Sequence, residues 1–238
     1  MDEGEYTKRN DLPSVRFVIN KTSGSNIGRR LRIVRGQVLQ EGKRGAKVYL
    51  ALNASTGEMI AMKQIEAKVN SKDREDTSVA ISRPSPVKRF MHELDILKDL
   101  NHPHIISYIG MEINVGQHSL YMEYVQCGDL ANVIRKYGKP DEANTKYFTM
   151  QILNGLEYLH SKGIAHGHLS TRKVLMDTSG ICKICGFGDS KLAEGDKATF
   201  AIDILSLGSI VFELWTGRRQ YHWEIVQVRL LISSVRTM

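Results

Sequence analysis

Cysteine is scarce in this chain, and its scarcity excludes the small disulfide-stabilised proteins. Three of the 238 residues are cysteine, which suits a reducing compartment better than a disulfide framework. Cys182 and Cys185 have C-x-x-C spacing, but residues three apart on a strand point to opposite faces. A structural zinc site needs four converging ligands. We therefore expect no disulfide framework and no metal site.

Long hydrophobic runs are also absent. No apolar segment reaches the roughly 18 to 20 residues that a membrane-spanning helix needs. The best candidate, residues 201–215, contains Asp203 and Glu213, which indicates a buried core helix. The first five residues are acidic and lack the basic-then-apolar order of a secretory signal. We expect a soluble cytoplasmic protein with no membrane partner.

Basic residues outnumber acidic ones, but the excess is confined to the two ends. The net charge is +7. Residues 1–35 carry +4 and residues 218–238 carry +3, so the segment between them is neutral. Charge runs in terminal segments are usually solvated. The folded part therefore shows no basic surface for nucleic acid, and we expect no nucleic-acid partner.

The first half of the chain has the pattern of β-strands. Residues 48–52 and 59–63 flank Ser-Thr-Gly at 55–57, a turn signal that predicts a hairpin. Residues 105–112 and 119–125 are two further strand candidates.

After Gly128 the chain is mainly helical, and one helix is predicted before that point. Phe90, Leu94 and Leu97 recur at the spacing of this earlier amphipathic helix. Apolar residues over 148–159 predict a helix of about five turns that ends before Gly163. Residues 174–184 predict a short hairpin. A strand-rich part followed by a helix-rich part indicates an α+β fold with two lobes.

Four segments carry a resemblance to a known family. They read Arg35-Gly-Gln-Val-Leu39, Thr56-Gly-Glu-Met-Ile-Ala-Met-Lys63, Leu120-Tyr-Met-Glu-Tyr-Val125 and Gln151-Ile-Leu-Asn-Gly-Leu-Glu-Tyr-Leu-His160. In this order and spacing they resemble a protein kinase, and most closely the MAP kinase kinase kinase group. The resemblance covers nearly the whole of residues 31–217.

The resemblance implies a two-lobed kinase fold with a small β-rich N-lobe and a truncated helical C-lobe. We assign residues 31–125 to the N-lobe and 126–217 to a partial C-lobe. Residues 1–30 are expected to be a disordered basic lead-in, and residues 218–238 an atypical tail.

The resemblance assigns a phosphate-gripping role to Lys63, which ends a strand as Ala-Met-Lys, and its pairing partner is Glu93. The glycine-rich loop is altered: Gln40 stands at the first glycine, whereas Gly42 and Gly45 remain. Glycines there let backbone N–H groups approach the phosphates.

The same resemblance implies residues for the adenosine part of a nucleotide. The base would lie between apolar side chains, accept hydrogen bonds from the connecting backbone, and have a carboxylate near its ribose. These residues are Val48, Ala61 and Leu175 for the base, Glu123 to Val125 for the backbone, and Asp129 for the ribose.

The catalytic positions of the family are replaced. The catalytic loop reads His166-Gly-His-Leu-Ser-Thr-Arg-Lys173, so that His168 stands at the catalytic aspartate and Lys173 at the metal-binding asparagine. Gly186 stands at the metal-binding aspartate, and Gly167 at the arginine that receives an activation-loop phosphate. Because both magnesium ligands are lost and a lysine would repel the cation, we expect no intact catalytic residue and no bound magnesium.

The segment between the catalytic loop and the next helix is short as well. Gly186 and Asp203 are 17 positions apart, where the family has roughly twice that number. The activation segment and the substrate-docking surface are therefore expected to be missing, and an incomplete C-lobe should expose apolar surface.

Together these features predict a catalytically inactive pseudokinase that acts as a binding or regulatory partner of an active kinase or another MAP kinase cascade member. ATP binding is compatible with the retained residues, and Lys173 with Lys63 would then neutralise its phosphates in place of magnesium. Two alternatives stay open. One is a Ser/Thr kinase with residual ATP-dependent phosphotransfer, and the other is a truncated gene product without function.

Overall fold

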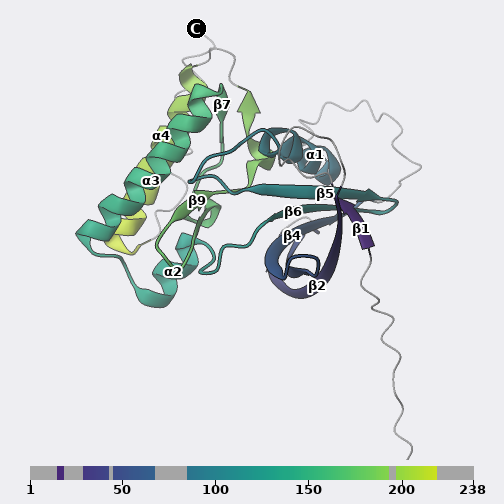
Figure 1. Cartoon of the computed structure of the whole chain (residues 1–238). Coiled ribbons are helices and arrows are strands. Elements are labelled where there is room, and N and C mark those ends of the chain that lie inside the picture. Colours follow the sequence, from purple (N-terminus) through teal and green to yellow (C-terminus); the bar gives the residue numbers. More distant parts are fainter. Residues whose placement is uncertain (1–14, 19–28, 43–44, 68–84, 193–196, 219–238) are drawn as a thin grey trace, which may run out of the picture. The chain divides into compact units, whose positions relative to one another are not determined.

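The described residues fall into two compact units. The computed structural model describes residues 15–18, 29–42, 45–67, 85–192 and 197–218 (Figure 1). The sheet unit comprises the described residues up to 67 together with 109–124, and the helical unit comprises 85–108 and the described residues from 125 onward. The predicted tail lies outside the described residues except for Arg218.

The sheet unit is a six-stranded sheet with the order β1-β2-β3-β4-β6-β5. Its strands are β1 (Val15–Val18), β2 (Arg29–Glu41), β3 (Lys47–Asn53), β4 (Glu58–Glu66), β5 (Tyr108–Asn114) and β6 (Gln117–Glu123). The pairs from β1 to β4 and the pair β4–β6 are antiparallel. The strongly curved ribbon of β2 to β4 is visible in Figure 1.

The β3–β4 hairpin confirms the prediction made from the Ser-Thr-Gly turn. Gly57 has a φ of +78°, a backbone conformation that residues with a Cβ rarely adopt. Its N–H and that of Thr56 donate to the carbonyl of Asn53, and the Asn53 side chain accepts from the N–H of Ser55. The turn is therefore closed by local groups, which is why the sequence signal was sufficient.

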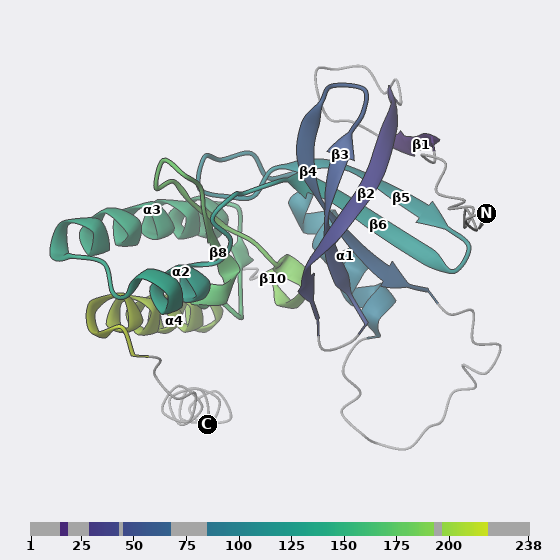
Figure 2. The ribbon, with the colours of Figure 1, turned by 90° about the horizontal axis from the view of Figure 1, so that it is seen from below.

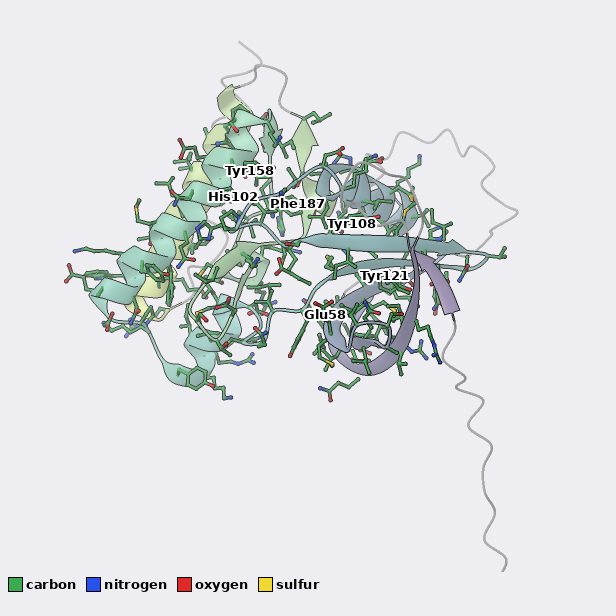
Figure 3. All side chains as sticks on the ribbon, in the orientation of Figure 1. Glu58, His102, Tyr108, Tyr121, Tyr158 and Phe187 are labelled. Atoms are coloured by element: carbon green, nitrogen blue, oxygen red, sulfur yellow. The ribbon has the colours of Figure 1, made fainter. Side chains whose placement is uncertain are left out.

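The strands bury one face in an apolar core. Because side chains alternate between faces along a strand, every second residue joins this core. Its members are Leu31, Ile33, Ala51, Ile60, Met62 and Tyr121, with Tyr49 and Ile109 packed against them. Tyr121, labelled in Figure 3, also donates from its hydroxyl to Glu112.

The expected disordered lead-in needs a correction, because it contains a strand. Val15 to Val18 form β1, which pairs with Arg29 to Arg32 at the start of β2. Two valines and a phenylalanine in four residues favour extended backbone, and this local signal outweighs the polar surroundings on which the prediction was based. Residues 1–14 and 19–28 lie outside the described part.

The helical unit contains four α-helices and several short elements. The helices are α1 (Pro86–Leu97), α2 (Leu130–Tyr137), α3 (Glu142–Ser161) and α4 (Lys197–Thr216). The short strands are β7 (Ile164–Ala165), β8 (Val174–Met176), β9 (Cys182–Ile184) and β10 (Lys191–Leu192), and the 3-10 turns are η1 (Thr171–Lys173) and η2 (Phe187–Asp189). Helices α3 and α4 lie side by side in both views (Figures 1 and 2).

Helix α1 belongs to the helical unit, whereas we had assigned residues 31–125 as a whole to the N-lobe. The helix begins at Pro86, after Ser85 has capped it by accepting from the N–H of Lys88. The guanidinium of Arg89 forms two contacts with the carboxylate of Asp189, and His92 Nε2 lies 2.6 Å from the carbonyl of Ser190. These contacts join α1 to the last residue of η2 and to the residue that follows it, and sequence patterns do not reveal them.

Helix α3 packs closely against the β8–β9 hairpin. A Cβ on Gly155 would lie 2.9 Å from the Ile184 side chain and 3.0 Å from the carbonyl of His104, so that only glycine fits at this position. The amide of Gln151 accepts from Cys182 N and donates to the carbonyl of Gly180. The predicted long helix and hairpin are thus both confirmed.

The segment that precedes β5 is irregular and rests on α3. The rings of His102 and Tyr158, labelled in Figure 3, stack with centroids 4.8 Å apart. We predicted a strand from residue 105, but Ile105 forms a single bridge with Ile184, and β5 begins at Tyr108.

Helix α4 is longer than the predicted core segment, and its composition is apolar. By length and composition alone, its Thr199–Thr216 portion could cross a membrane, and one third of that window is buried. Asp203 is fully buried, however, and Glu213 accepts from the hydroxyl of Thr171 at 2.9 Å. Through these two residues one face of α4 packs into the helical unit. Its other face exposes large apolar side chains: Ile204, Leu205, Phe212 and Trp215.

We predict that removing the Asp203 carboxylate strongly destabilises the helical unit. The carboxylate accepts from His166 N at 2.7 Å and Gly167 N at 2.8 Å, and it lies 2.9 Å from His160 Nε2. Asp203→Ala should lower the free energy of unfolding by about 3 kcal/mol, because buried donors lose a charged acceptor. Urea unfolding followed by circular dichroism measures the loss.

Asp141→Ala is the matched control for that variant. Asp141 is exposed and caps α3 through one bond to Asn144 N, so its loss should cost about 1 kcal/mol. Equal losses for the two variants would contradict the anchoring role of Asp203.

Candidate functional site

The sheet unit gathers three of the predicted nucleotide residues on the face opposite its core. Val48 in β3 lies directly across from Lys63 in β4, and Ala61 precedes Lys63 by two residues. Because side chains alternate along a strand, all three share one face. Met122 pairs with Ala61, and Glu123 with Ile60. The arrangement offers an apolar strip that ends in an ammonium group.

The glycine loop forms the β2–β3 turn. Gln40 pairs with Val48 across the two strands, directly after a register shift between Val38 and Gln40, so the residue at the first glycine position is part of the paired strand. Gly42 N donates to the carbonyl of Ala46 at 2.7 Å, and Gly45 has a φ of +75°. Residues 43–44 lie outside the described part.

The helical unit positions the remaining nucleotide residues. Asp129 forms a single antiparallel bridge with Leu175, which brings the two residues side by side, and Val125 is buried. The carboxylate of Asp129 caps α2 by accepting from the backbone and side-chain amides of Asn132, each at 2.8 Å. If Asp129 contacts a ribose as predicted, the same carboxylate also caps α2.

Glu93 is buried on α1 and faces the turn that contains η2. A Cβ on Gly188 would lie 3.4 Å from its Oε2. Lys63 belongs to the sheet unit and Glu93 to the helical unit, so their predicted pairing stays a prediction.

His166 is a buried neutral group that organises the catalytic-loop segment. Its Nε2 lies 3.1 Å from the carbonyl of Cys185, and its Nδ1 lies 3.3 Å from His168 N. Burial lowers the pKa of His166, so the neutral ring donates from Nε2 and accepts at Nδ1. The ring also packs against Phe187, with centroids 5.4 Å apart.

Gly167 leaves no space for the arginine that the resemblance assigns to its position. It has a φ of +72°, and a Cβ there would lie 2.9 Å from the backbone carbonyl of Asp189. A larger residue would have to displace backbone, because the neighbouring atom is not part of a flexible side chain. The glycine is therefore a requirement of the local packing.

Lys173 occupies the space of the missing side chain at residue 186. Gly186 has the left-handed conformation, with a φ of +82°. A Cβ built on it would lie 2.5 Å from Lys173 Nζ and 2.9 Å from Lys173 Cδ. The backbone bond from Cys185 N to the carbonyl of Lys173, 2.9 Å long, keeps the two segments adjacent. Both predicted replacements thus meet at one point.

The carboxylate of Asp189 is close enough to respond to the charge of Lys173, and it is already paired with Arg89. Burial alone would raise the pKa of Asp189, but the hydrogen bond and the charge of Arg89 outweigh it and hold the pKa below its ordinary value. The charges of His168 and Lys173 act in the same direction. His168, at the position of the catalytic aspartate, is exposed.

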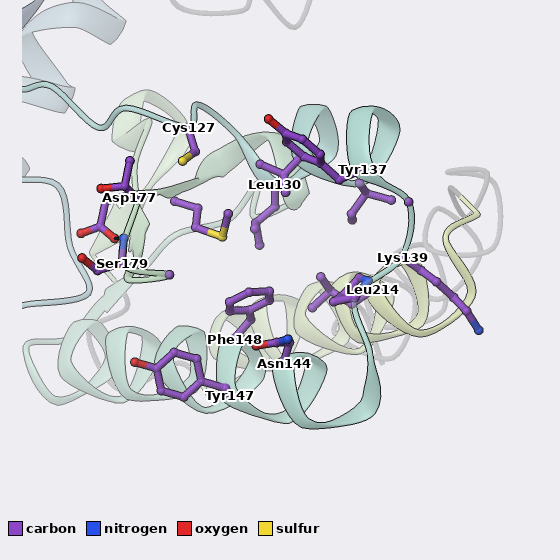
Figure 4. A pocket seen from close by; sticks show the side chains of 17 residues that line it. Cys127, Leu130, Tyr137, Lys139, Asn144, Tyr147, Phe148, Asp177, Ser179 and Leu214 are labelled. Atoms are coloured by element: carbon purple, nitrogen blue, oxygen red, sulfur yellow. Dashed lines mark hydrogen bonds between the residues drawn. The ribbon is translucent and has the colours of Figure 1, made fainter.

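Two features of the helical unit were missed at the level of sequence. One is the Arg89–Asp189 pair, for which the only signal was that Arg89 precedes Glu93 by one helical turn. The other is a groove of about 440 Å³ between α2, α3 and the β8–β9 turn (Figure 4). It is lined by Leu130, Tyr137, Tyr147, Phe148 and Asp177, among others, and no motif pointed to it.

Cys182 and Cys185 of the C-x-x-C sequence form no disulfide. Cys182 is buried, which raises the pKa of its thiol to about 12, and Cys185 is half-buried. Within the described ranges no group of three or more histidine, cysteine, aspartate or glutamate side chains is placed to hold a metal ion.

We predict that the conformations of Gly186 and Lys173 are energetically coupled. Gly186→Ala should lower the free energy of unfolding by about 1–2 kcal/mol, because the new Cβ is strained in the left-handed region and displaces Lys173. Lys173→Ala in the same chain should recover about 0.5 kcal/mol or more of this loss. A double-mutant cycle from urea unfolding measures the coupling.

Gly163→Ala serves as the control in that cycle. Gly163 also has a positive φ, +71°, but a Cβ there meets nothing within 4 Å. The loss in free energy of unfolding caused by Gly163→Ala should be the same with lysine or alanine at residue 173. Additive losses for Gly186→Ala and Lys173→Ala would show that the two side-chain spaces are independent.

Comparison with known proteins agrees with these motifs. A family model described as protein kinase domain matches residues 34–199. The chain is 38% identical over 229 residues to the serine/threonine-protein kinase BCK1/SLK1/SSP31 of Saccharomyces cerevisiae, which covers 86% of this chain and 15% of that protein. It is 32% identical over 228 residues to the MAP kinase kinase kinase mkh1 of Schizosaccharomyces pombe, covering 84% and 20%.

A third relative is the mitogen-activated protein kinase kinase kinase A of Dictyostelium discoideum, 30% identical over 230 residues, with 87% of this chain and 23% of that protein covered. The chain therefore spans less than a quarter of the length of each of these three relatives. The α+β, kinase-like architecture predicted from the sequence is confirmed. The chain belongs to the protein kinase family, and within that family it is similar to the MAP kinase kinase kinases.

Proposed function

We propose that this kinase domain does not transfer phosphate and instead acts by binding a protein of a MAP kinase cascade. The observation that carries the proposal is the meeting of Lys173 and Gly186, where the family has two oxygen ligands for magnesium. Phosphoryl transfer depends on magnesium to neutralise the charge of the β- and γ-phosphates. An ammonium group and a bare backbone supply no oxygen ligand.

The position of the catalytic aspartate supports the same proposal. His168 replaces a carboxylate that accepts the proton of the substrate hydroxyl. Loss of one electrostatic group in an active site typically reduces turnover about 10²- to 10³-fold. Three such groups are replaced here, so turnover should be reduced at least as far as by the loss of any one of them.

The rest of the domain supports a role as a folded binding module. The apolar core of the sheet unit, the buried Asp203 and the neutral His166 are all retained. Three cysteines that form no disulfide, one of them exposed, suit the reducing environment of the cytoplasm, which is the location we propose. The similarity to MAP kinase kinase kinases favours a cascade kinase as partner.

We predict that the purified chain transfers no γ-phosphate from radiolabelled ATP to itself or to a general substrate protein, with magnesium or with manganese. A Lys63→Met variant sets the background, because it removes the one retained catalytic-type lysine. Incorporation clearly above that background would establish a residual Ser/Thr kinase and overturn the proposal.

We predict that the chain binds a purified MAP kinase kinase with a dissociation constant of about 10 μM or tighter, measurable by titration calorimetry. The Asp203→Ala variant is the control, since its destabilised helical unit should weaken binding. If the wild-type chain unfolds cooperatively but binds no kinase of the cascade, the binding role is wrong.

A further inference from the structure

The residues at the metal position of the family do not fit magnesium. Magnesium prefers oxygen ligands in an octahedral arrangement. Gly186 has no side chain, and the Nζ of Lys173 lies where a side chain at residue 186 would begin. The carboxylate of Asp189, on which the charge of Lys173 acts, is held by two contacts with Arg89. A divalent cation placed at the position of a side chain on residue 186 would meet the ammonium group of Lys173.

The ammonium group of Lys173 keeps an unneutralised positive charge. Among the described residues no carboxylate lies within ion-pair distance of its Nζ, and the side chain is half-buried. Its charge acts on Asp189 and on His166. The ring of His166 is buried and hydrogen-bonded to backbone, so it does not neutralise the charge.

The charged groups near Lys173 do not neutralise its ammonium group either. His168 is exposed beside this position and adds positive charge when it is protonated. Arg89 offsets Asp189, so that the pair is neutral overall. Lys173 itself takes part in no such pair among the described residues, and the η1 turn and the backbone bond between Lys173 and Cys185 hold it in place. A half-buried fixed cation of this kind recognises an anionic oxygen.

We propose that the Lys173 ammonium takes the place of the divalent cation, so that the domain binds the phosphates of a nucleoside triphosphate without magnesium. This inference rests on the proposed function only in treating the domain as kinase-like and inactive. An ammonium group donates up to three hydrogen bonds but carries half the charge of magnesium. It therefore suits the binding of phosphate oxygens and not the stabilisation of phosphoryl transfer.

The test is ATP binding to the full chain by titration calorimetry and thermal unfolding, once in EDTA and once in magnesium. We expect dissociation constants that agree within about twofold between the two buffers. Lys173→Asn, which restores the amide of the family, should weaken binding in EDTA by about tenfold or more, the equivalent of about 1.4 kcal/mol. Lys173→Arg should retain most of the affinity because it keeps the charge.

Arg172→Asn is the matched control. Arg172 is the adjacent residue in η1 and is exposed, so the variant removes one positive charge without touching the space at Gly186. Its affinity should equal that of the wild type. Unfolding midpoints without ligand show whether each variant is folded, and Lys173→Gln provides a second neutral replacement if Lys173→Asn is not.

Titrations with adenosine and with inorganic triphosphate show whether the domain binds a nucleotide or a free polyphosphate. Adenosine binding should not depend on residue 173. Tighter binding of ATP than of triphosphate identifies a nucleotide, whereas equal binding identifies a free polyphosphate, and either result supports the role of Lys173. A strict magnesium requirement, no ATP binding in either buffer, or equal affinities for wild type and Lys173→Asn would overturn it. These outcomes are independent of the phosphotransfer assay, which tests the proposed function alone.

Discussion

The carboxylate of Asp203 is the group on which the catalytic-loop half of the helical unit depends. It accepts from two successive backbone N–H groups, those of His166 and Gly167, and it lies beside His160. A fully buried charge is costly unless several donors compensate it, so the loop is held in the one conformation that supplies these donors. The placement of His166, and through it that of the Cys185 carbonyl, follows from this constraint.

This constraint explains how the architecture persists while the catalytic groups change. The bonds to Asp203 come from backbone atoms, and the contacts of His166 are to a backbone carbonyl and a backbone N–H. None of these hydrogen bonds uses the side chain of residue 168, so a histidine can stand there in place of the family's aspartate without disturbing them. Residue 167 is different, because the backbone carbonyl of Asp189 leaves room only for glycine at its present positive φ.

Local signals made much of the fold predictable. The turn at Gly57 closes on Asn53 four residues earlier, and the apolar spacing of α3 lies within one helix. The grouping of α1 with the helical unit was not predictable, because Arg89 and Asp189 are 100 residues apart. Both replacements at 173 and 186 were readable in the sequence, but no pattern indicates that one side chain fills the space of the other. The groove beside α2 arises from packing and has no linear signal.

The occupied space at Gly186 links two positions that the family uses as separate metal ligands. A side chain at residue 186 would place its Cβ against the flexible end of the Lys173 side chain, so the lysine would have to move aside to accommodate it. Restoring an oxygen ligand at residue 186 would still leave an ammonium group at residue 173, so a metal site with both ligands requires a change at each of the two positions.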